Sequence, residues 1–155
     1  MHEGYLQQAI ILASENVDSG EGGPYGAIIV KANQVIAASG NKVTRDLDPT
    51  AHAEVMAIRA ACIQLNDFHL NGCILYTSCE PCPMCLGAIY WARIDAVYYA
   101  SNRFDAAEAK FDDSFIYDEI ALLPEQRRIP MKQITLPNAK KPFEVWNNNA
   151  DKIIY

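Results

Sequence analysis

Two short motifs contain residues whose side chains bind metal ions. The first is His52-Ala53-Glu54, and the second, further along the chain, is Pro81-Cys82-Pro83-Met84-Cys85. Thiolate and imidazole are preferred ligands of Zn²⁺, and a catalytic zinc site supplies three protein ligands while leaving one position for water. At the start of a helix Cys82 and Cys85 face the same way, and the helix N-terminus favours their thiolate forms. We therefore predict that His52, Cys82 and Cys85 hold one Zn²⁺ per subunit, with Glu54 moving protons to and from an activated water.

The pattern of apolar residues predicts the elements that position these motifs. Residues 5–17 repeat at helical spacing, with Val17 in the apolar stripe. Two short apolar runs around residues 32–34 predict a β-hairpin, and Asp48 or Thr50 is the predicted cap of a second helix. Strands and helices alternate after the hairpin, which predicts an α/β sheet with helices packed on its faces. The later elements predicted are a strand at 73–77, a helix at 83–93, a strand at 96–100, a helical or irregular segment at 104–119, a fifth strand at 131–136 and a last helix at 143–151.

The composition predicts a single folded domain over residues 1–155. Half of the residues (50%) are hydrophobic and only 21% are charged, which excludes disorder as the main state. The longest apolar run, Cys85 to Ala92, is too short for a membrane span, and the first residues show no secretory signal. We therefore expect a cytoplasmic protein with no membrane partner. The net charge of −6 argues against a nucleic-acid partner, because phosphate backbones are repelled.

The five cysteines allow other interpretations of the metal motif. An odd number of cysteines argues against a disulfide framework and favours metal binding or catalysis. A structural zinc site would need a fourth donor, for which Cys79, Cys73 and His69 are available. An iron–sulfur cluster would need another cysteine at position 89, which is Ile89. We expect Cys79 to be a buried small residue near the site, and Cys62 and Cys73 to be core residues.

A His-x-Glu motif followed by Pro-Cys-x-x-Cys is the signature of zinc deaminases that act on nucleobases. Beyond this shared motif the sequence resembles the bacterial guanine deaminases of the cytidine-deaminase-like superfamily. The resemblance extends over nearly the whole chain and includes Asn41 and the terminal Tyr155. The segment after residue 100 is its more specific part, since the zinc motif alone cannot choose a substrate. The other segments that carry the resemblance are residues 22–27, 48–54, 76–93 and 108–117.

The resemblance implies a three-layer α/β/α fold with a five-stranded mixed sheet, and hydrolysis of guanine to xanthine and ammonia. It makes Glu54 the proton shuttle and Asp113 a second acid that faces the substrate amino group. It implies that Asn41 reads the purine edge through its amide, which offers a donor and an acceptor. It also implies a homodimer whose C-terminal segment is exchanged between subunits. The other substrate-binding residues that it implies are Ala53, Tyr25 (where the bacterial enzymes often have phenylalanine), and two aromatic walls, Trp91 and Tyr155.

Three other functions compete with this hypothesis. A tRNA adenosine deaminase has the same zinc motif, but tRNA binding favours clustered basic residues, and this chain has only the short pairs Arg127-Arg128 and Lys140-Lys141. Guanosine, cytosine or a pterin could fill the same type of pocket, because substrate choice depends on the pocket and not on the fold. The third alternative is a non-enzymatic structural zinc module.

Overall fold

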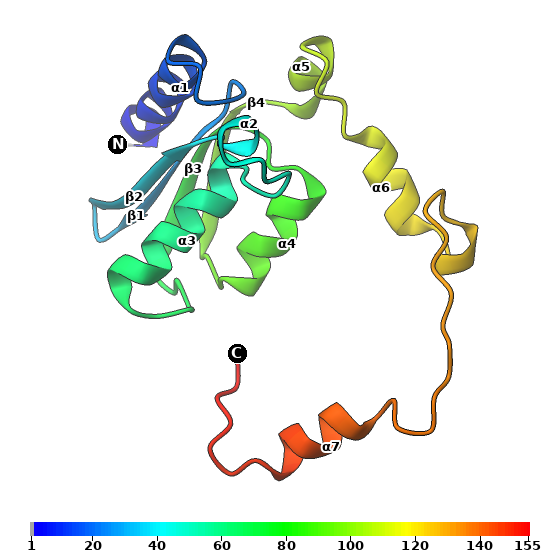
Figure 1. Cartoon of the computed structure of the whole chain (residues 1–155). Coiled ribbons are helices and arrows are strands. Elements are labelled where there is room, and N and C mark those ends of the chain that lie inside the picture. The colour runs from blue at the N-terminus through cyan, green and yellow to red at the C-terminus, as the bar shows by residue number, and fades with distance from the viewer. Residues whose placement is uncertain (1) are drawn as a thin grey trace. The chain divides into compact units, whose positions relative to one another are not determined.

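A mixed sheet of four strands lies at the centre of the first of two structural units (Figure 1). The computed structural model describes residues 2–155 and divides the chain into Met1–Asp113 and Ser114–Tyr155. The strand order is β2-β1-β3-β4; β1 is antiparallel to β2 and β3, whereas β3 and β4 are parallel. The mixed α/β sheet is confirmed. The strands are β1 (Gly26–Lys31), β2 (Gln34–Gly40), β3 (Cys73–Cys79) and β4 (Ala96–Ser101).

The predicted hairpin between β1 and β2 is confirmed. Its two turn residues, Ala32 and Asn33, have φ angles of 48° and 64°. Positive φ at both central residues is the geometry of the two-residue turn that matches the twist of antiparallel strands. The hairpin brings Gly40 opposite Gly26, so that the residues following β2 and preceding β1 lie at the same end of the sheet.

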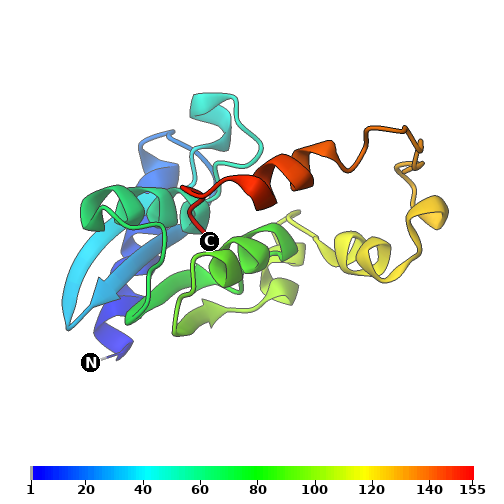
Figure 2. The ribbon, with the colours of Figure 1, turned by 90° about the horizontal axis from the view of Figure 1, so that it is seen from below.

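Helices cover both faces of the sheet, which gives the expected three layers (Figures 1 and 2). Successive strand residues point to opposite faces. Ile28 and Tyr76 pack against α1 (His2–Asp18), whereas Ile29 and Leu75 belong to the core beneath α3 (Ala53–Leu65) and α4 (Pro83–Trp91). Figure 2 shows α3 and α4 side by side on their face, and this arrangement brings the N-termini of both helices to the same end of the unit. Two short helices, α2 (Val43–Asp46) and α5 (Arg103–Glu108), complete it.

The apolar stripe of α1 differs from the prediction at one position. Val17 was placed in the stripe, but 49% of its surface is exposed, whereas Asn16 is buried. Asn16 donates from Nδ2 to the backbone oxygens of Gly23 and Asn41, each at 2.9 Å. These two hydrogen bonds stabilise a buried polar residue where periodicity predicted an apolar one.

The second unit contains helices and no fifth strand within Ser114–Tyr155. Its elements are α6 (Ser114–Ala121), a 3₁₀ turn η1 (Pro124–Gln126) and α7 (Lys141–Asn148). The prediction of a strand at 131–136 is wrong, because those residues are exposed and have no ladder partner. Prolines at 130 and 137 flank the segment and cannot donate to a ladder. The last helix begins before the predicted residue 143 and ends before residue 151.

A search of residues 2–155 for a helix long and apolar enough to cross a membrane found none.

Candidate metal and catalytic site

The three predicted ligands meet where α3 and α4 begin. His52 is the N-cap residue of α3, Cys82 is the N-cap residue of α4, and Cys85 lies in the first turn of α4. The Nδ1 atom of His52 lies 3.5 Å from the sulfur of Cys82 and 3.5 Å from the sulfur of Cys85. Ligand atoms of all three residues lie within 4.8 Å of one another. This spacing and the mixed sulfur and nitrogen donors fit a zinc ion with an open fourth position.

The local sequence explains where α3 begins. Asp48 and Thr50 were the predicted caps, and this prediction is wrong because α3 begins at Ala53 without a side-chain cap. The carboxylate of Asp48 instead accepts hydrogen bonds from the backbone nitrogen and the hydroxyl of Thr50, at 2.8 and 2.7 Å. This local turn uses the capping group before the helix begins. His52 therefore becomes the N-cap residue, and its ring points to the thiols.

Proline sets the start of α4 in a different way. Pro83 occupies the first turn, where its missing N–H costs nothing and its fixed φ suits a helix. The N-cap residue Cys82 then has extended backbone, with φ −66° and ψ 167°. Both ligand-bearing helices thus present the positive ends of their dipoles to the same small volume.

The electrostatics of the ligand group favour negative charge on sulfur. The side-chain hydrogen bond from Cys85 lowers the pKa of Cys82 to about 4, with further lowering by His52. The same hydrogen bond raises the pKa of Cys85, and the bond to Cys82 raises the pKa of His52. A thiolate is the form that binds metal, so this arrangement of the two sulfurs and His52 suits a cation between them.

Glu54 is a buried acid next to this group. Its side chain is only 5% exposed, and burial raises the pKa of the carboxyl above its usual range. Cys82 raises this pKa further, whereas a side-chain hydrogen bond with Cys85 lowers it. A buried carboxyl beside a metal site, with its pKa raised, is suited to accept a proton and return it during a reaction.

No fourth thiol or imidazole joins the ligand group in residues 2–155. Cys79 was one alternative donor, but its sulfur donates to the backbone oxygen of Asn102 at 3.5 Å, and it is buried as expected. Cys73 lies fully buried in the core, which confirms that prediction too. His69 lies in the loop that precedes β3, and its ring stacks edge-on against Phe68. The group therefore has the three-ligand composition of a catalytic site.

Asn41 is buried at the end of β2, and only half of its carboxamide is available to a ligand. Its Oδ1 accepts hydrogen bonds from the backbone nitrogens of Val43, at 3.1 Å, and Gly23, at 3.4 Å. Because backbone nitrogens only donate, these bonds determine which end of the amide is oxygen. Within the described chain Nδ2 has no protein partner, so the side chain presents a donor to a ligand.

Asn16 is a site residue that the sequence analysis missed. Its amide joins the backbone of Gly23 to that of Asn41, as described above, and so positions the glycine-rich loop that precedes Tyr25. A side chain at Gly22 would collide with the backbone oxygen of Asn41, so this close approach requires glycine. The available signal was a polar residue inside an otherwise apolar helix face.

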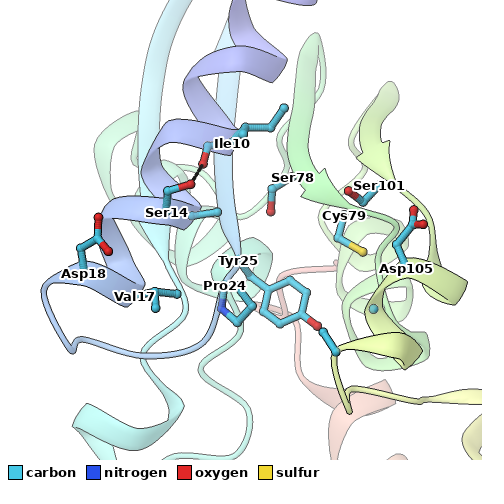
Figure 3. A pocket seen from close by; sticks show the side chains of 13 residues that line it. Ile10, Ser14, Val17, Asp18, Pro24, Tyr25, Ser78, Cys79, Ser101 and Asp105 are labelled. Carbon is cyan, nitrogen blue, oxygen red and sulfur yellow. Dashed lines mark hydrogen bonds between the residues drawn. The ribbon is translucent and has the colours of Figure 1, made fainter.

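Tyr25 lies between the ligand region and a separate cavity. Its ring packs edge-on against Phe111, with ring centres 5.3 Å apart, and burial raises the pKa of its hydroxyl, with smaller contributions from Cys79 and Glu54. On the α1 side, Tyr25 and Cys79 line a cavity of about 470 Å³ (Figure 3). This cavity contains none of the three ligands, so it is distinct from the metal site.

Asp113, the predicted second acid, is the last residue of the first unit. Burial raises the pKa of its carboxyl, and the charge of Cys82 raises it further. The charge of Arg103 acts in the opposite direction. Asp113 is therefore close enough to the ligand group to interact with it electrostatically.

The remaining predicted residues occupy different places. Ala53 is fully buried in the first turn of α3, between His52 and Glu54. Trp91 lies at the C-terminal end of α4, opposite to the end that carries Cys82, and is 65% exposed. Tyr155 belongs to the second unit, where its ring packs edge-on against Trp146. The contacts of Ala53, Trp91 and Tyr155 with substrate stay predictions.

Comparisons with known proteins agree with this site. Residues 1–101 match the family model for the cytidine and deoxycytidylate deaminase zinc-binding region. Guanine deaminase of Bacillus subtilis is 58% identical over 99% of both chains, and its crystal structure superposes with a TM-score of 0.99 over 100% of this chain and 99% of that chain.

Other members of the family match a smaller part of the chain. Guanine deaminase from Nitrosomonas europaea is 29% identical with a TM-score of 0.66, over 72% of this chain and 64% of that chain. A tRNA-specific adenosine deaminase of Aquifex aeolicus is 43% identical over 64% of this chain and 65% of its own length. The family match and the full-length similarity confirm the cytidine-deaminase-like fold and the zinc-binding deaminase domain. The chain belongs to the zinc-dependent deaminases of the cytidine and deoxycytidylate deaminase family, together with the guanine deaminase of Bacillus subtilis.

Proposed function

We propose that this protein hydrolyses guanine to xanthine and ammonia. The proposal rests on how much of the chain each relative matches. The tRNA-specific relative matches only 64% of the chain, whereas the guanine deaminase of Bacillus subtilis matches 99% of it. The zinc motif is common to both, so the remaining part of the chain distinguishes the substrates. The match to the zinc-binding family model ends at residue 101, and the segment that leads to Asp113 lies beyond it.

The chemistry follows from the arrangement of residues. His52, Cys82 and Cys85 would hold Zn²⁺, which supplies a water of lowered pKa when bound. The buried carboxyl of Glu54 accepts a proton from that water and gives it to N3 of the purine ring, and it then moves the proton of the newly added hydroxyl group to the departing amine. The reaction balances because a C2–O bond forms, the exocyclic C2–N bond breaks, and the nitrogen leaves as ammonia.

Two further residues orient the base in this proposal. Asn41 donates from Nδ2 to an acceptor on the purine edge, since its oxygen is already bonded to backbone nitrogens. Asp113 accepts a hydrogen bond from the substrate amino group and assists its proton transfer. The ring of Tyr25, supported by Phe111, forms an aromatic wall.

A substrate panel tests the proposal. Purified zinc-loaded protein is incubated with guanine, guanosine, adenine, adenosine, cytosine and cytidine, and the products are followed by mass spectrometry. We expect guanine alone to be converted. Conversion of guanosine would mean that the pocket accepts ribose, and conversion of none, with zinc bound, would refute the proposal and favour a polynucleotide substrate or a structural zinc module.

Replacing Glu54 tests the proton shuttle separately. Glu54→Gln keeps the size of the side chain and removes the proton-accepting group. We expect zinc binding to stay at one ion per chain while turnover falls by about 100-fold or more, the usual range for a general acid–base residue. Glu15→Gln, an exposed position on α1, is the matched control. Turnover close to wild type in Glu54→Gln would remove Glu54 from the mechanism.

A homodimer with an exchanged C-terminal segment is also part of the proposal. Its support is apolar surface: Leu86 and Tyr90 of α4 are exposed in the first unit, and Phe143 and Val145 of α7 are exposed in the second. Sedimentation should therefore give twice the chain mass of 17.2 kDa. Deleting residues 141–155 should lower the dimer fraction, and an active protein that sediments at 17.2 kDa would exclude the exchange. The expected cytoplasmic location stays a prediction.

A further inference from the structure

Cys79 and Glu80, which precede the ligand loop, are both bonded to the junction between β4 and α5. Cys79 is paired with Ser101 at the end of the parallel strands, and the backbone nitrogen of Glu80 donates to the oxygen of Ser101 at 2.9 Å. The Glu80 carboxylate accepts a hydrogen bond from the backbone nitrogen of Arg103 at 3.1 Å. The residues immediately before Cys82 are therefore connected to the start of α5.

The helix α5 is a short element with defined ends. At its start Asn102 and Asp105 form a reciprocal capping box, with Asn102 Oδ1 accepting from Asp105 and Asp105 Oδ2 accepting from Asn102. At its end Phe111 N donates to Ala106 O and Lys110 N donates to Ala107 O, the pair of bonds of a Schellman motif. A helix this short is not stable alone, so contacts outside it determine its position.

The far end of α5 leads to residues of the proposed substrate site. Phe111 closes the Schellman motif and packs its ring edge-on against Tyr25. Asp113 follows two residues later, and the charge of Arg103 acts on its carboxyl. The segment from Arg103 to Asp113 thus connects the Glu80 hydrogen bond to the aromatic wall and the second acid.

We propose that Glu80 is a positioning residue, whose bond to the Arg103 nitrogen holds α5 so that Phe111 and Asp113 face the metal site. Glu80 itself touches neither substrate nor metal in this role. The inference rests on the proposed function, because it assigns a purpose to the position of Asp113. It also explains why an acid adjoins the metal ligands without being a ligand.

A proline variant and an alanine variant at Arg103 isolate the hydrogen bond between the Arg103 nitrogen and Glu80. Arg103 is the first residue of α5, a position where proline is well tolerated, and the preceding Asn102 has the extended backbone that proline requires. Arg103→Pro removes the N–H that donates to Glu80, and Arg103→Ala removes the same side chain but keeps the N–H. We expect the proline variant to have a kcat about 10-fold lower than the alanine variant, with a smaller change in KM and one zinc per chain in both.

Substitution of the acceptor should give the complementary result. Glu80→Ala should lower kcat about 10-fold, whereas Glu80→Gln should recover most of it, because an amide oxygen still accepts from the Arg103 N–H. Glu15→Ala, which removes an exposed carboxylate from α1, is the charge-matched control. The positioning role would be overturned by equal kcat values for Arg103→Pro and Arg103→Ala. It would also be overturned if Glu80→Ala lowered Tm and left kcat unchanged.

Hydrogen exchange separates this inference from the proposed function. In Glu80→Ala and Arg103→Pro the amides of residues 104–113 should exchange faster than in wild type, whatever the substrate is. A wild-type protein that does not deaminate guanine would refute the proposed function. Unchanged exchange in this segment would refute the connection between Glu80 and α5.

Discussion

Replacing Asn41 with aspartate separates the two hydrogen-bonding functions of its carboxamide. The side chain is buried, and its oxygen accepts from the backbone nitrogens of Val43 and Gly23 at 3.1 and 3.4 Å. Aspartate has the same shape and can accept both bonds, but it cannot donate to a purine. Alanine loses both functions. The aspartate variant therefore tests recognition of the purine alone. The alanine variant tests recognition together with the local hydrogen bonds to the backbone.

The geometry sets the size of each effect. Only the Val43 bond has a length typical of a strong N–H···O bond, so we count it as one full bond and the Gly23 bond as a weak one. Losing them, with one donor left buried, should destabilise Asn41→Ala by about 2 kcal/mol, or roughly 4–8 °C in Tm for a chain of this size. Asn41→Asp should lose less Tm than Asn41→Ala, because its oxygens still accept both bonds, although desolvation of the buried carboxylate reduces this advantage. An unpaired purine acceptor costs about 1–3 kcal/mol, so kcat/KM for guanine should fall about 5- to 150-fold in both variants.

Thermal unfolding and steady-state kinetics on guanine measure these effects in parallel. The expected pattern is similar loss of kcat/KM in both variants with the larger loss of Tm in the alanine variant. Asn41→Asp with wild-type kcat/KM would refute the donor role. An Asn41→Ala variant as stable as wild type would show that the backbone nitrogens do not depend on this acceptor.

Three further predictions follow from the backbone and from Tyr25. Burial raises the pKa of Tyr25, so the folded state holds its proton more tightly than the unfolded chain; stability should fall as the pH rises above about 10, and Tyr25→Phe should flatten that fall in urea titrations. A side chain at Gly26 would collide with the backbone oxygen of Ala9, so Gly26→Ala should greatly reduce the yield of folded protein. Gly87 lies inside α4 with open space around it, so Gly87→Ala should raise the free energy of unfolding by about 0.5–1 kcal/mol, measured by chemical unfolding. Lys110 has a φ of 72° at the end of α5, so Lys110→Gly should gain about 0.5–1 kcal/mol, and a lower unfolding midpoint would contradict the strain argument.

The metal ligands were predictable from sequence because their chemistry depends on residue type and short spacing. Cys82 and Cys85 share a face of one helix start wherever the chain places that helix. Pro83 gave a local signal for where the helix begins, and the structure confirms it. The start of α3 was harder to predict, because Asp48 and Thr50 are both good caps and bond to each other instead. Only their geometry shows that His52 begins the helix.

The wrong predictions involve partners that are distant in sequence. Residues 131–136 include Ile134 and Thr135, which favour strands, but a strand needs a neighbouring ladder, and the described part of the second unit offers none. Val17 is the apolar residue of this last turn and was expected in the core, yet its polar neighbour Asn16 is buried because Gly23 and Asn41 accept its hydrogen bonds. In each case a long-range hydrogen bond, or its absence, outweighed the local preference of the residues.

The sequence by itself predicted the candidate ligands His52, Cys82 and Cys85, the acid Glu54 beside them and the alternation of strands and helices, because these depend on residue type and on local spacing. The tertiary structure decided how the remaining groups are used. Asn41 presents a donor only because Val43 and Gly23 occupy its oxygen. Glu80 reaches Arg103 only because β3 and β4 end side by side. Such functions depend on which hydrogen-bond partners the fold has already used, and a linear sequence does not contain that information.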